Sequence, residues 1–219
     1  RRITRQLRHV GAMNALLTTS DDSDESLIKK VQEFEGIGHK NLALEVTTKD
    51  TYQWQEPNHI KCHVAVIDSG VKYNILNQLK NVGCKVTVFP CSVTADEILS
   101  QSFDGVLLSN GPGNPEAVTS VIKTVQELAG KIPLFGICLG HQILCHAFGF
   151  KLTKLPFGHH GVNHPIKHLF TDRIEITSQN HIYCAEKSMV PDNFVISHMK
   201  QNRTDINWIF NFDFIQGPC

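Results

Sequence analysis

The stretch that decides the fold reads Phe135-Gly136-Ile137-Cys138-Leu139-Gly140-His141-Gln142. It begins as an apolar strand, passes through G-x-C-x-G and continues at once as a helix expected over His141–Phe148. Glycines let a chain turn sharply around a residue held in a strained conformation. The same strand-turn-helix arrangement carries the nucleophile of G-x-S-x-G enzymes. The sequence therefore predicts an α/β protein in which the Cys138 thiol projects from the carboxyl edge of a sheet.

The predicted turn gives Cys138 a chemical role. A thiol at a helix N-terminus is expected to have a lowered pKa, because the helix dipole favours the thiolate. The backbone amide of Leu139 is then placed to stabilise an oxyanion. The competing interpretation is a buried structural cysteine between two packing glycines. Cys145, on the following helix, is interpreted as a core residue.

The residues around this turn alternate between strand and helix patterns. Short apolar runs predict strands over 64–67, 85–89, 106–108 and 133–137. Apolar stripes predict helices over 75–82, 95–99 and 117–128, with Thr94 as the N-cap of the second. This order predicts a doubly wound, mostly parallel sheet. Beyond Gly149 the pattern changes to strands, including 173–178 and 208–215.

The chain divides into three parts at the level of sequence. Residues 1–50 form a mixed piece, with a basic helix over Ile3–Val10, a strand-like run over Ala15–Thr19 and a helix that begins at Ser23. Residues 51–60 are expected to be a linker. Residues 61–219 carry the α/β pattern, and the chain begins at Arg1 without a methionine, which suggests a fragment or a processed form.

Composition excludes several classes of function. The 219 residues contain 21 Lys plus Arg and 21 Asp plus Glu, so no global charge gathers nucleic acid or anionic lipid. The N-terminal arginines are interpreted as a solvated helix face. No apolar run has the length of a membrane span, and no signal peptide opens the chain. Seven cysteines without regular spacing argue against a secreted disulfide scaffold. We therefore expect a cytoplasmic protein.

A second loop, Ser109–Pro115, follows a predicted strand and precedes a helix. Gly111 and Gly113 on either side of a proline predict a rigid turn that exposes backbone amides at the sheet edge. An ordinary connecting loop is the alternative. Because it lies one strand-helix unit before Cys138, both are expected to face one cleft.

These motifs together resemble the class I (triad) glutamine amidotransferases, and four further stretches resemble the carbamoyl-phosphate synthetase branch of that family. Phe157–Pro165 is similar to its F-G-H-H-G-G-N-H-P signature, and Ser178–His181 to its S-Q-N-H-G-F segment. Asp68–Ile75 is similar to its D-x-G-x-K-x-N-I, and Thr4–Asn14 to the end of its N-terminal domain. The resemblance covers nearly the whole chain, with 1–50 as part of a smaller N-terminal α+β domain and 61–219 as the amidotransferase domain.

The resemblance implies a function and a site. Cys138 would attack the side-chain amide of L-glutamine, form a γ-glutamyl thioester and release ammonia to a large synthetase subunit, for pyrimidine and arginine biosynthesis. The residues implied to hold glutamine are Gly111, Gly113, Leu139, Gln142, Asn180, Ile182 and Tyr183. No phosphate-cradling Gly-rich Lys-Ser/Thr loop is present, so no cofactor is expected on this chain, and ATP and Mg²⁺ are expected on the large subunit.

The histidines His159, His160 and His164 raise the question of a metal site. The spacing of His160 and His164 aligns two ligands only on a helix, and Gly161 and Pro165 make a helix unfavourable. We therefore expect structural histidines in a loop and no metal.

The chain departs from the family pattern at its end and at two glycines. The triad His and Glu belong to a late Q-G-H-P-E motif, where this sequence reads Gln216-Gly217-Pro218-Cys219. Ile182 and Val162 stand where the family has glycine, and Ile182 is expected to crowd the glutamine pocket or to forbid a positive φ. We therefore expect little or no glutaminase activity from this chain. The alternatives are a non-catalytic subunit with a structural or regulatory role, a different thiol hydrolase, or an artefactual ending.

Overall fold

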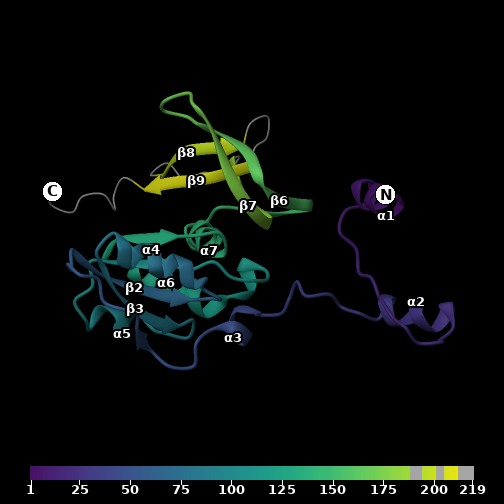
Figure 1. Cartoon of the computed structure of the whole chain (residues 1–219), viewed down its shortest axis with the longest axis horizontal. Coiled ribbons are helices and arrows are strands. Elements are labelled where there is room, and N and C mark those ends of the chain that lie inside the picture. Colours follow the sequence, from purple (N-terminus) through teal and green to yellow (C-terminus); the bar gives the residue numbers. More distant parts are fainter. Residues whose placement is uncertain (188–193, 201–204, 212–219) are drawn as a thin grey trace.

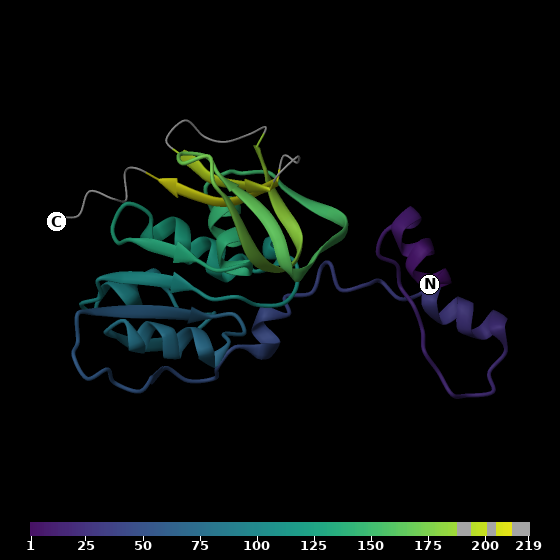
Figure 2. The same cartoon turned by 45° about the horizontal axis from the view of Figure 1, so that its top comes forward.

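The computed structural model of the chain describes residues 1–187, 194–200 and, for the backbone, 205–211. It has an α/β body, an antiparallel β unit beside it and an N-terminal segment (Figures 1 and 2). The Ala12 amide of that segment donates a hydrogen bond to the Pro156 carbonyl of the antiparallel unit, at 2.7 Å. The predicted strand over 208–215 lies partly in β9 (Asp205–Asn211), and its last four residues lie outside the described part of the chain, as do Gln216–Cys219.

The body is built on a five-stranded sheet in the order β1-β3-β2-β4-β5. The strands from β2 to β5 are parallel, which confirms the predicted α/β class. The strands are β1 (Tyr52–Gln53), β2 (Cys62–Asp68), β3 (Cys84–Pro90), β4 (Gly105–Leu108) and β5 (Leu134–Gly136).

Helices cover both faces of this sheet. The helices are α4 (Tyr73–Asn81), α5 (Ala95–Leu99), α6 (Thr119–Leu128) and α7 (Leu139–Ala147), with the 3-10 turn η1 (Pro115–Ala117) before α6. Side chains of α4 pack with Val66, Val86 and Val88 on one face. Side chains of α5, α6 and α7 pack with Ala65, Ile67 and other residues on the opposite face. Residues that alternate along β2 therefore enter two different cores, as expected for a strand buried on both sides.

Thr94 shows how the sequence begins one of these helices. Its side chain accepts a hydrogen bond from the Glu97 amide, and the Glu97 carboxylate accepts one from the Thr94 amide. This capping box satisfies donors that a helix N-terminus leaves without intrahelical partners, so the predicted N-cap is confirmed.

The antiparallel unit closes in the order β6-β7-β9-β8. Its strands are β6 (Leu152–His168), β7 (Ile174–Glu186), β8 (Phe194–Lys200) and β9. β7 packs against α7, so this unit lies over the carboxyl-edge turn that precedes α7. The histidines expected in a loop lie in β6 instead, because pairs such as His159 with His181 and His160 with Asn180 extend the ladder through them.

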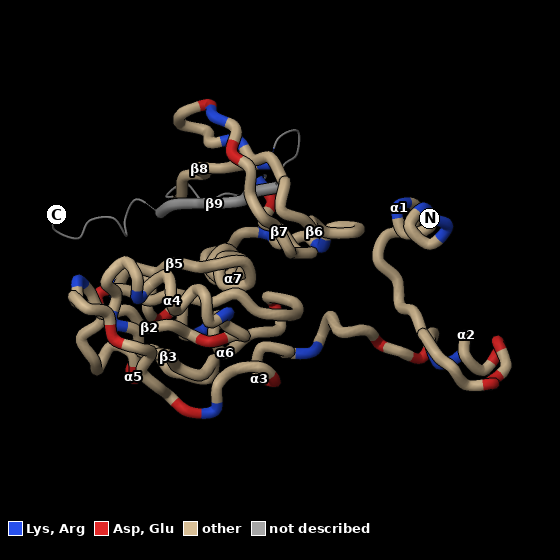
Figure 3. Tube along the Cα trace, in the orientation of Figure 1, with Lys and Arg blue, Asp and Glu red and all other residues tan. Residues whose placement is uncertain are grey.

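The N-terminal segment contains α1 (Arg2–Val10), α2 (Asp24–Gln32) and α3 (Ala43–Val46). Ser23 caps α2 as predicted. The expected strand at Ala15–Thr19 is wrong: it is not part of any sheet in the described residues, and Leu17 is 99% exposed. Figure 3 shows basic residues gathered on α1, whose residues are exposed apart from the half-buried Leu7.

The end of this segment docks on the body. Ala43 is fully buried in the core, and the Asn114 carboxamide donates a hydrogen bond to the Gly38 carbonyl. The segment expected as a linker contributes β1, which pairs antiparallel with β3. Tyr52 and Trp54 pack against the α4-side core, and this apolar burial gives the segment a fixed place.

No helix within the described residues is long and apolar enough to cross a membrane.

Asp68, at the end of β2, connects this docked segment to the sheet edge. Its buried carboxylate accepts hydrogen bonds from the amides of Thr48, Gly70 and Val71, at 2.7, 2.8 and 2.7 Å. We predict that Asp68→Ala lowers the free energy of unfolding by about 3 kcal/mol, because three amides lose a charged acceptor. Chemical denaturation measures this change. The exposed Asp50→Ala is the control, with an expected change within about 0.5 kcal/mol. An equal loss in both variants would contradict the prediction.

Candidate active site

Cys138 occupies the strained turn that the sequence predicts. Its backbone has φ 55° and ψ −108°, and it is the N-cap of α7. Within the described residues only one other non-glycine residue, Asp172, has a positive φ. Side chains rarely adopt this conformation, so the surrounding structure must hold it. The turn directs the thiol away from the sheet. The residue keeps exposed surface, although neighbouring atoms enclose much of its sulfur.

The two glycines of G-x-C-x-G are required because the backbones pass very close to each other. A Cβ added at Gly136 would lie 2.5 Å from the Gly140 carbonyl carbon, and one at Gly140 would lie 2.2 Å from the Leu108 oxygen. Neither glycine has a positive φ. Close packing between β4, β5 and the start of α7 is therefore the reason for glycine here, and the strained conformation falls on the cysteine itself.

The loop after β4 lies against this turn. A Cβ at Gly111 would meet the Ser69 oxygen at 2.1 Å and the Leu139 side chain at 2.7 Å. The Asn110 carboxamide donates to the Gly70 carbonyl and accepts from the Lys72 amide. The loops that follow β2 and β4 are thus fixed to each other beside Cys138.

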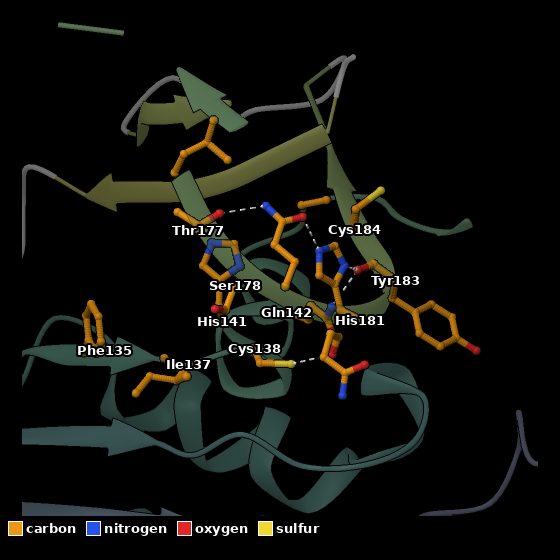
Figure 4. Close-up of a pocket in the computed structure, with 15 residues that line it drawn as sticks. Phe135, Ile137, Cys138, His141, Gln142, Thr177, Ser178, His181, Tyr183 and Cys184 are labelled. Carbon is orange, nitrogen blue, oxygen red and sulfur yellow. Dashed lines mark hydrogen bonds between the residues drawn. The ribbon is translucent and has the colours of Figure 1, made fainter. Parts of the chain in front are cut away.

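A cavity of about 260 Å³ lies between this turn and β7 (Figure 4). Its walls come from β5, the start of α7, β6 and β7. The lining residues are Phe135, Gly136, Ile137, Cys138, His141, Gln142, Ile166, Thr177, Ser178, Gln179, Asn180, His181, Tyr183, Cys184 and Ala185. Cys138, Gln142, Asn180 and Tyr183, all predicted from the sequence, therefore meet at one cavity.

The remaining predicted residues, Gly111, Gly113, Leu139 and Ile182, do not line this cavity. Leu139 is buried directly behind Cys138, and Gly111 packs against it. Gly113 has a φ of +96° and faces Leu42 of the N-terminal segment. Ile182 is half-buried on β7 between two lining residues, and it adopts no positive φ. The expectation that Ile182 crowds the cavity finds no support in its position, and Val162 is 78% exposed.

The thiol of Cys138 is held in its neutral form. It donates a hydrogen bond to the Asn180 carbonyl, with 3.7 Å between sulfur and oxygen, and no histidine in the described part of the chain bonds to it. Burial of the sulfur by the cavity walls raises the pKa of the Cys138 thiol, although the Leu139 amide and Lys72 act in the opposite direction. The predicted lowering of this pKa is therefore wrong, because desolvation outweighs the helix N-terminus.

Gln142 joins α7 to β7. Its side-chain nitrogen donates to the Tyr183 carbonyl at 2.6 Å, which leaves Oε1 directed as an acceptor. Asn180 is oriented in turn by the His160 ring, whose Nδ1 donates to Asn180 Oδ1 at 2.7 Å. The carboxamides of Gln142 and Asn180 therefore present fixed polar groups to the cavity.

Two histidines that the sequence analysis did not single out, His181 and His141, also line the cavity. His181 donates from Nδ1 to the Tyr183 carbonyl at 2.8 Å, so in the neutral ring Nε2 accepts, and His159 Nδ1 lies 3.3 Å from it. Burial lowers the pKa of His141 to about 4, so its ring is neutral at physiological pH. His181 belongs to the quoted S-Q-N-H stretch, which is the signal that marks it.

Three histidines gather on the neighbouring strands β6 and β7. His159, His164 and His181 lie close together, yet no group of three or more possible ligands within the described residues is arranged to hold a metal ion.

Comparison with known proteins identifies the family. The profile of the family "Glutamine amidotransferase class-I" matches residues 65–212, which is more than half of the chain. The chain belongs to the class-I glutamine amidotransferases.

The curated relatives of the chain include carbamoyl phosphate synthase small chains. The chain is 45% identical over 201 residues to the carbamoyl phosphate synthase small chain of Chlorobaculum tepidum, a match over 90% of this chain and 55% of that protein. It is 42% identical over 215 residues to the protein of the same name from Vibrio parahaemolyticus, over 91% and 57%. The chain thus spans about half the length of the curated relatives it matches.

Solved structures agree on the fold of this class-I amidotransferase. A putative GMP synthase component from Thermoplasma acidophilum superposes with a TM-score of 0.59 at 19% identity, over 71% of this chain and 80% of that chain. A glutamine amidotransferase from Thermotoga maritima gives a TM-score of 0.51 at 13% identity, over 67% and 70%. At these identities the likeness concerns the fold alone.

The amidotransferase turn supplies a structural prediction. Gly140→Ala is expected to lower the free energy of unfolding by about 3 kcal/mol or more, since the added methyl would overlap the Leu108 backbone. Gly38→Ala, where a Cβ meets nothing within 4 Å, is the control and should change stability by less than about 1 kcal/mol. Thermal or chemical unfolding decides the matter, and a Gly140→Ala protein as stable as the control would disprove the close approach.

The raised pKa of the amidotransferase thiol supplies a second prediction. Alkylation by iodoacetamide requires thiolate, so the rate at Cys138 should still be rising well above the ordinary thiol pKa of about 8.5. Lys72→Gln should move the profile to higher pH, because the lysine charge lowers this pKa. Peptide mass spectrometry follows the rate at Cys138 itself. A rate that is already level near neutral pH would mean that the helix dipole outweighs desolvation.

Proposed function

We propose that this chain is the glutamine-hydrolysing part of a carbamoyl phosphate synthase small chain, with Cys138 as its nucleophile. The observation that carries the proposal is the Cys138 turn: a strained residue at a helix N-terminus that lines a cavity together with Gln142 and Asn180. The relatives that bear this name match nine-tenths of the chain.

The reaction would proceed through a thioester. The Cys138 sulfur, after losing its proton, attacks the γ-carbonyl carbon of L-glutamine, and the carbonyl π electrons move onto oxygen. The Leu139 amide, which already lies beside the sulfur, is the donor we assign to this oxyanion. When the C–N bond breaks, the nitrogen takes up a proton and leaves as ammonia. Water then attacks the thioester to give glutamate and restore the thiol.

The cavity residues have the chemistry that an amide substrate needs. Gln142 Oε1 accepts from the amide nitrogen of glutamine in our proposal, because its own nitrogen is committed to Tyr183. In this proposal Asn180 and Tyr183 contact glutamine from the β7 side. The backbone amides around Gly111 and Gly113 contact it from the β4 side. Ile182 would contribute through its backbone, since its side chain does not line the cavity.

The partner in this proposal is the large synthetase subunit. Ammonia released at Cys138 would be used there with ATP and Mg²⁺ in a ligase reaction that supplies pyrimidine and arginine biosynthesis. Residues 1–50 would be the end of the small chain's N-terminal domain, and residues 61–219 its amidotransferase domain.

A second candidate function is a small-chain homologue with little catalytic activity and a structural or regulatory role. Two observations favour it: the raised pKa of the Cys138 thiol, and the Asn180 carbonyl as its hydrogen-bond partner in place of a base. The sequence also has Pro218 where the family motif has the triad histidine.

Covalent labelling separates the proposed glutamine site from an unrelated thiol. We expect a glutamine analogue with a chloroketone in place of the amide to modify Cys138, and L-glutamine to protect the thiol, whereas D-glutamine does not. Asn180→Ala should raise the half-saturating analogue concentration by roughly tenfold, and Gln142→Ala should raise the L-glutamine concentration that half-protects the thiol by roughly tenfold, for about 1–2 kcal/mol of lost hydrogen bonding each. Modification at the same rate with and without L-glutamine would overturn the glutamine site.

Ammonia release then separates the two candidates. The impaired candidate predicts turnover lower than that of ordinary enzymes by roughly 10²–10⁴-fold, with any remaining activity abolished in Cys138→Ala. Turnover near the usual rate of about 1–10³ s⁻¹ would exclude the impaired candidate. Saturable, glutamine-protected labelling without any turnover would select it.

A further inference from the structure

Cys62 and Cys84 form a pair of thiols at the opposite end of the sheet from Cys138. They are the first residues of the neighbouring parallel strands β2 and β3, and they are direct partners in the register. Their sulfur atoms lie 3.4 Å apart, in a hydrogen bond from Cys62 to Cys84. Cys138 follows the carboxyl end of β5, so the two thiol sites lie at opposite edges of the sheet.

The backbone at this pair suits a direct covalent link. Neighbouring strands lie about 4.8 Å apart, which falls within the Cα separation of about 4.4–6.8 Å that disulfides require. Both side chains point to the α4 side of the sheet, because each begins an alternation that continues into Val64 or Val86 of that core. The Lys61 amide also donates to the Gly83 carbonyl at 2.8 Å and holds the two strand starts together. A disulfide here needs a rotation of two side chains and no rearrangement of strands.

The two thiols differ in access. Cys62 is partly exposed, whereas Cys84 is 8% exposed. Burial and the neighbouring Cys62 raise the pKa of Cys84 to about 11, and the Lys61 charge acts against this. An oxidant from solution therefore reacts with Cys62 first, and Cys84 is the thiol that then attacks the oxidised Cys62 sulfur.

We propose that Cys62 and Cys84 are a reversible redox pair that a peroxide converts to an intramolecular disulfide. The Cys62 thiolate attacks one peroxide oxygen, the O–O bond breaks, and the departing hydroxide takes a proton to become water. Cys62 is then a sulfenic acid. The Cys84 sulfur gives its proton to solvent and attacks the Cys62 sulfur, and the S–O bond breaks with loss of a second water. Two thiols are oxidised by two electrons as one peroxide is reduced, and a dithiol reductant reverses the change.

The link would act on a segment that borders the proposed glutamine site. The closed loop runs from residue 62 to residue 84 and contains α4, Lys72 and the Asp68 turn. Restricting the unfolded chain in this way stabilises the folded one. We expect the melting temperature of the oxidised protein to exceed that of the reduced protein by roughly 5–10 °C.

Peptide mapping of the full chain tests the pair. Trypsin cleaves after Lys61, Lys72, Lys80 and Lys85, so the disulfide would join peptides 62–72 and 81–85. After hydrogen peroxide treatment we expect this joined peptide, two hydrogens lighter than its parts, and its loss on addition of dithiothreitol. Its formation should be faster at higher pH, because Cys84 must lose its proton.

Variants make the test specific. Cys62→Ala and Cys84→Ala should each abolish the joined peptide and the rise in melting temperature. Cys138→Ser, which removes an exposed thiol outside the pair, should leave both unchanged. Overoxidation of Cys62 to a sulfinic acid while Cys84 stays reduced would overturn the proposal. So would a joined peptide that forms while the melting temperatures of reduced and oxidised protein coincide, since a link between these two strand starts restricts the unfolded chain and should raise the melting temperature.

Discussion

The site depends on the close approach of three backbone segments at one point. Gly136 and Gly140 bring the end of β5 and the start of α7 almost into contact, and Gly140 also lies against the Leu108 oxygen of β4. Because the end of β5 and the start of α7 are both fixed, the chain must turn sharply between them. Cys138 lies at this turn and adopts the positive φ. Backbone strain of this kind costs roughly 1–3 kcal/mol and persists only where the surroundings determine it. Packing within the sheet therefore stabilises the conformation that directs Cys138 into the cavity.

Much of the fold can be predicted from short stretches of the sequence, whereas the cavity cannot. The parallel strands, the capping box at Thr94 and the turn at Cys138 are encoded in short stretches, where hydrophobic period and glycine spacing carry the information. One wall of the cavity is β7, which lies about forty residues further along the chain and approaches α7 only through tertiary packing. Asn180 and Tyr183 are predictable from the sequence by resemblance alone. His181 belongs to the same S-Q-N-H stretch, but only the structure shows that it lines the cavity with Cys138.

The errors of the sequence analysis share this non-local cause. The sequence predicts a linker where β1 lies, because two residues, Tyr52 and Gln53, pair with β3 without any periodic signal. It predicts a loop for the β6 histidines because Gly161 and Pro165 make a helix unfavourable, yet these residues continue a strand whose pairing with β7 extends past both. It predicts a lowered pKa for Cys138 because the helix N-terminus is visible in sequence, whereas the burial that raises this pKa is not.

The hydrogen bonds around Tyr183 connect the Cys138 turn to the cavity wall on β7. The Tyr183 carbonyl accepts from Gln142 of α7 and from His181 of β7, so the helix that begins at Cys138 is tied to the strand opposite. Cys138 itself bonds the Asn180 carbonyl of the same strand. A ligand that displaces the Asn180 carbonyl from the Cys138 sulfur frees the thiol. The hydrogen bond from Gln142 to Tyr183 meanwhile keeps β7 in place beside α7. Because burial opposes the thiolate, such a ligand gains reactivity only if a base receives the proton. The thiol therefore needs two things in order to react: a preformed cavity and a group that accepts its proton. These hydrogen bonds supply the cavity, but they do not supply the proton acceptor.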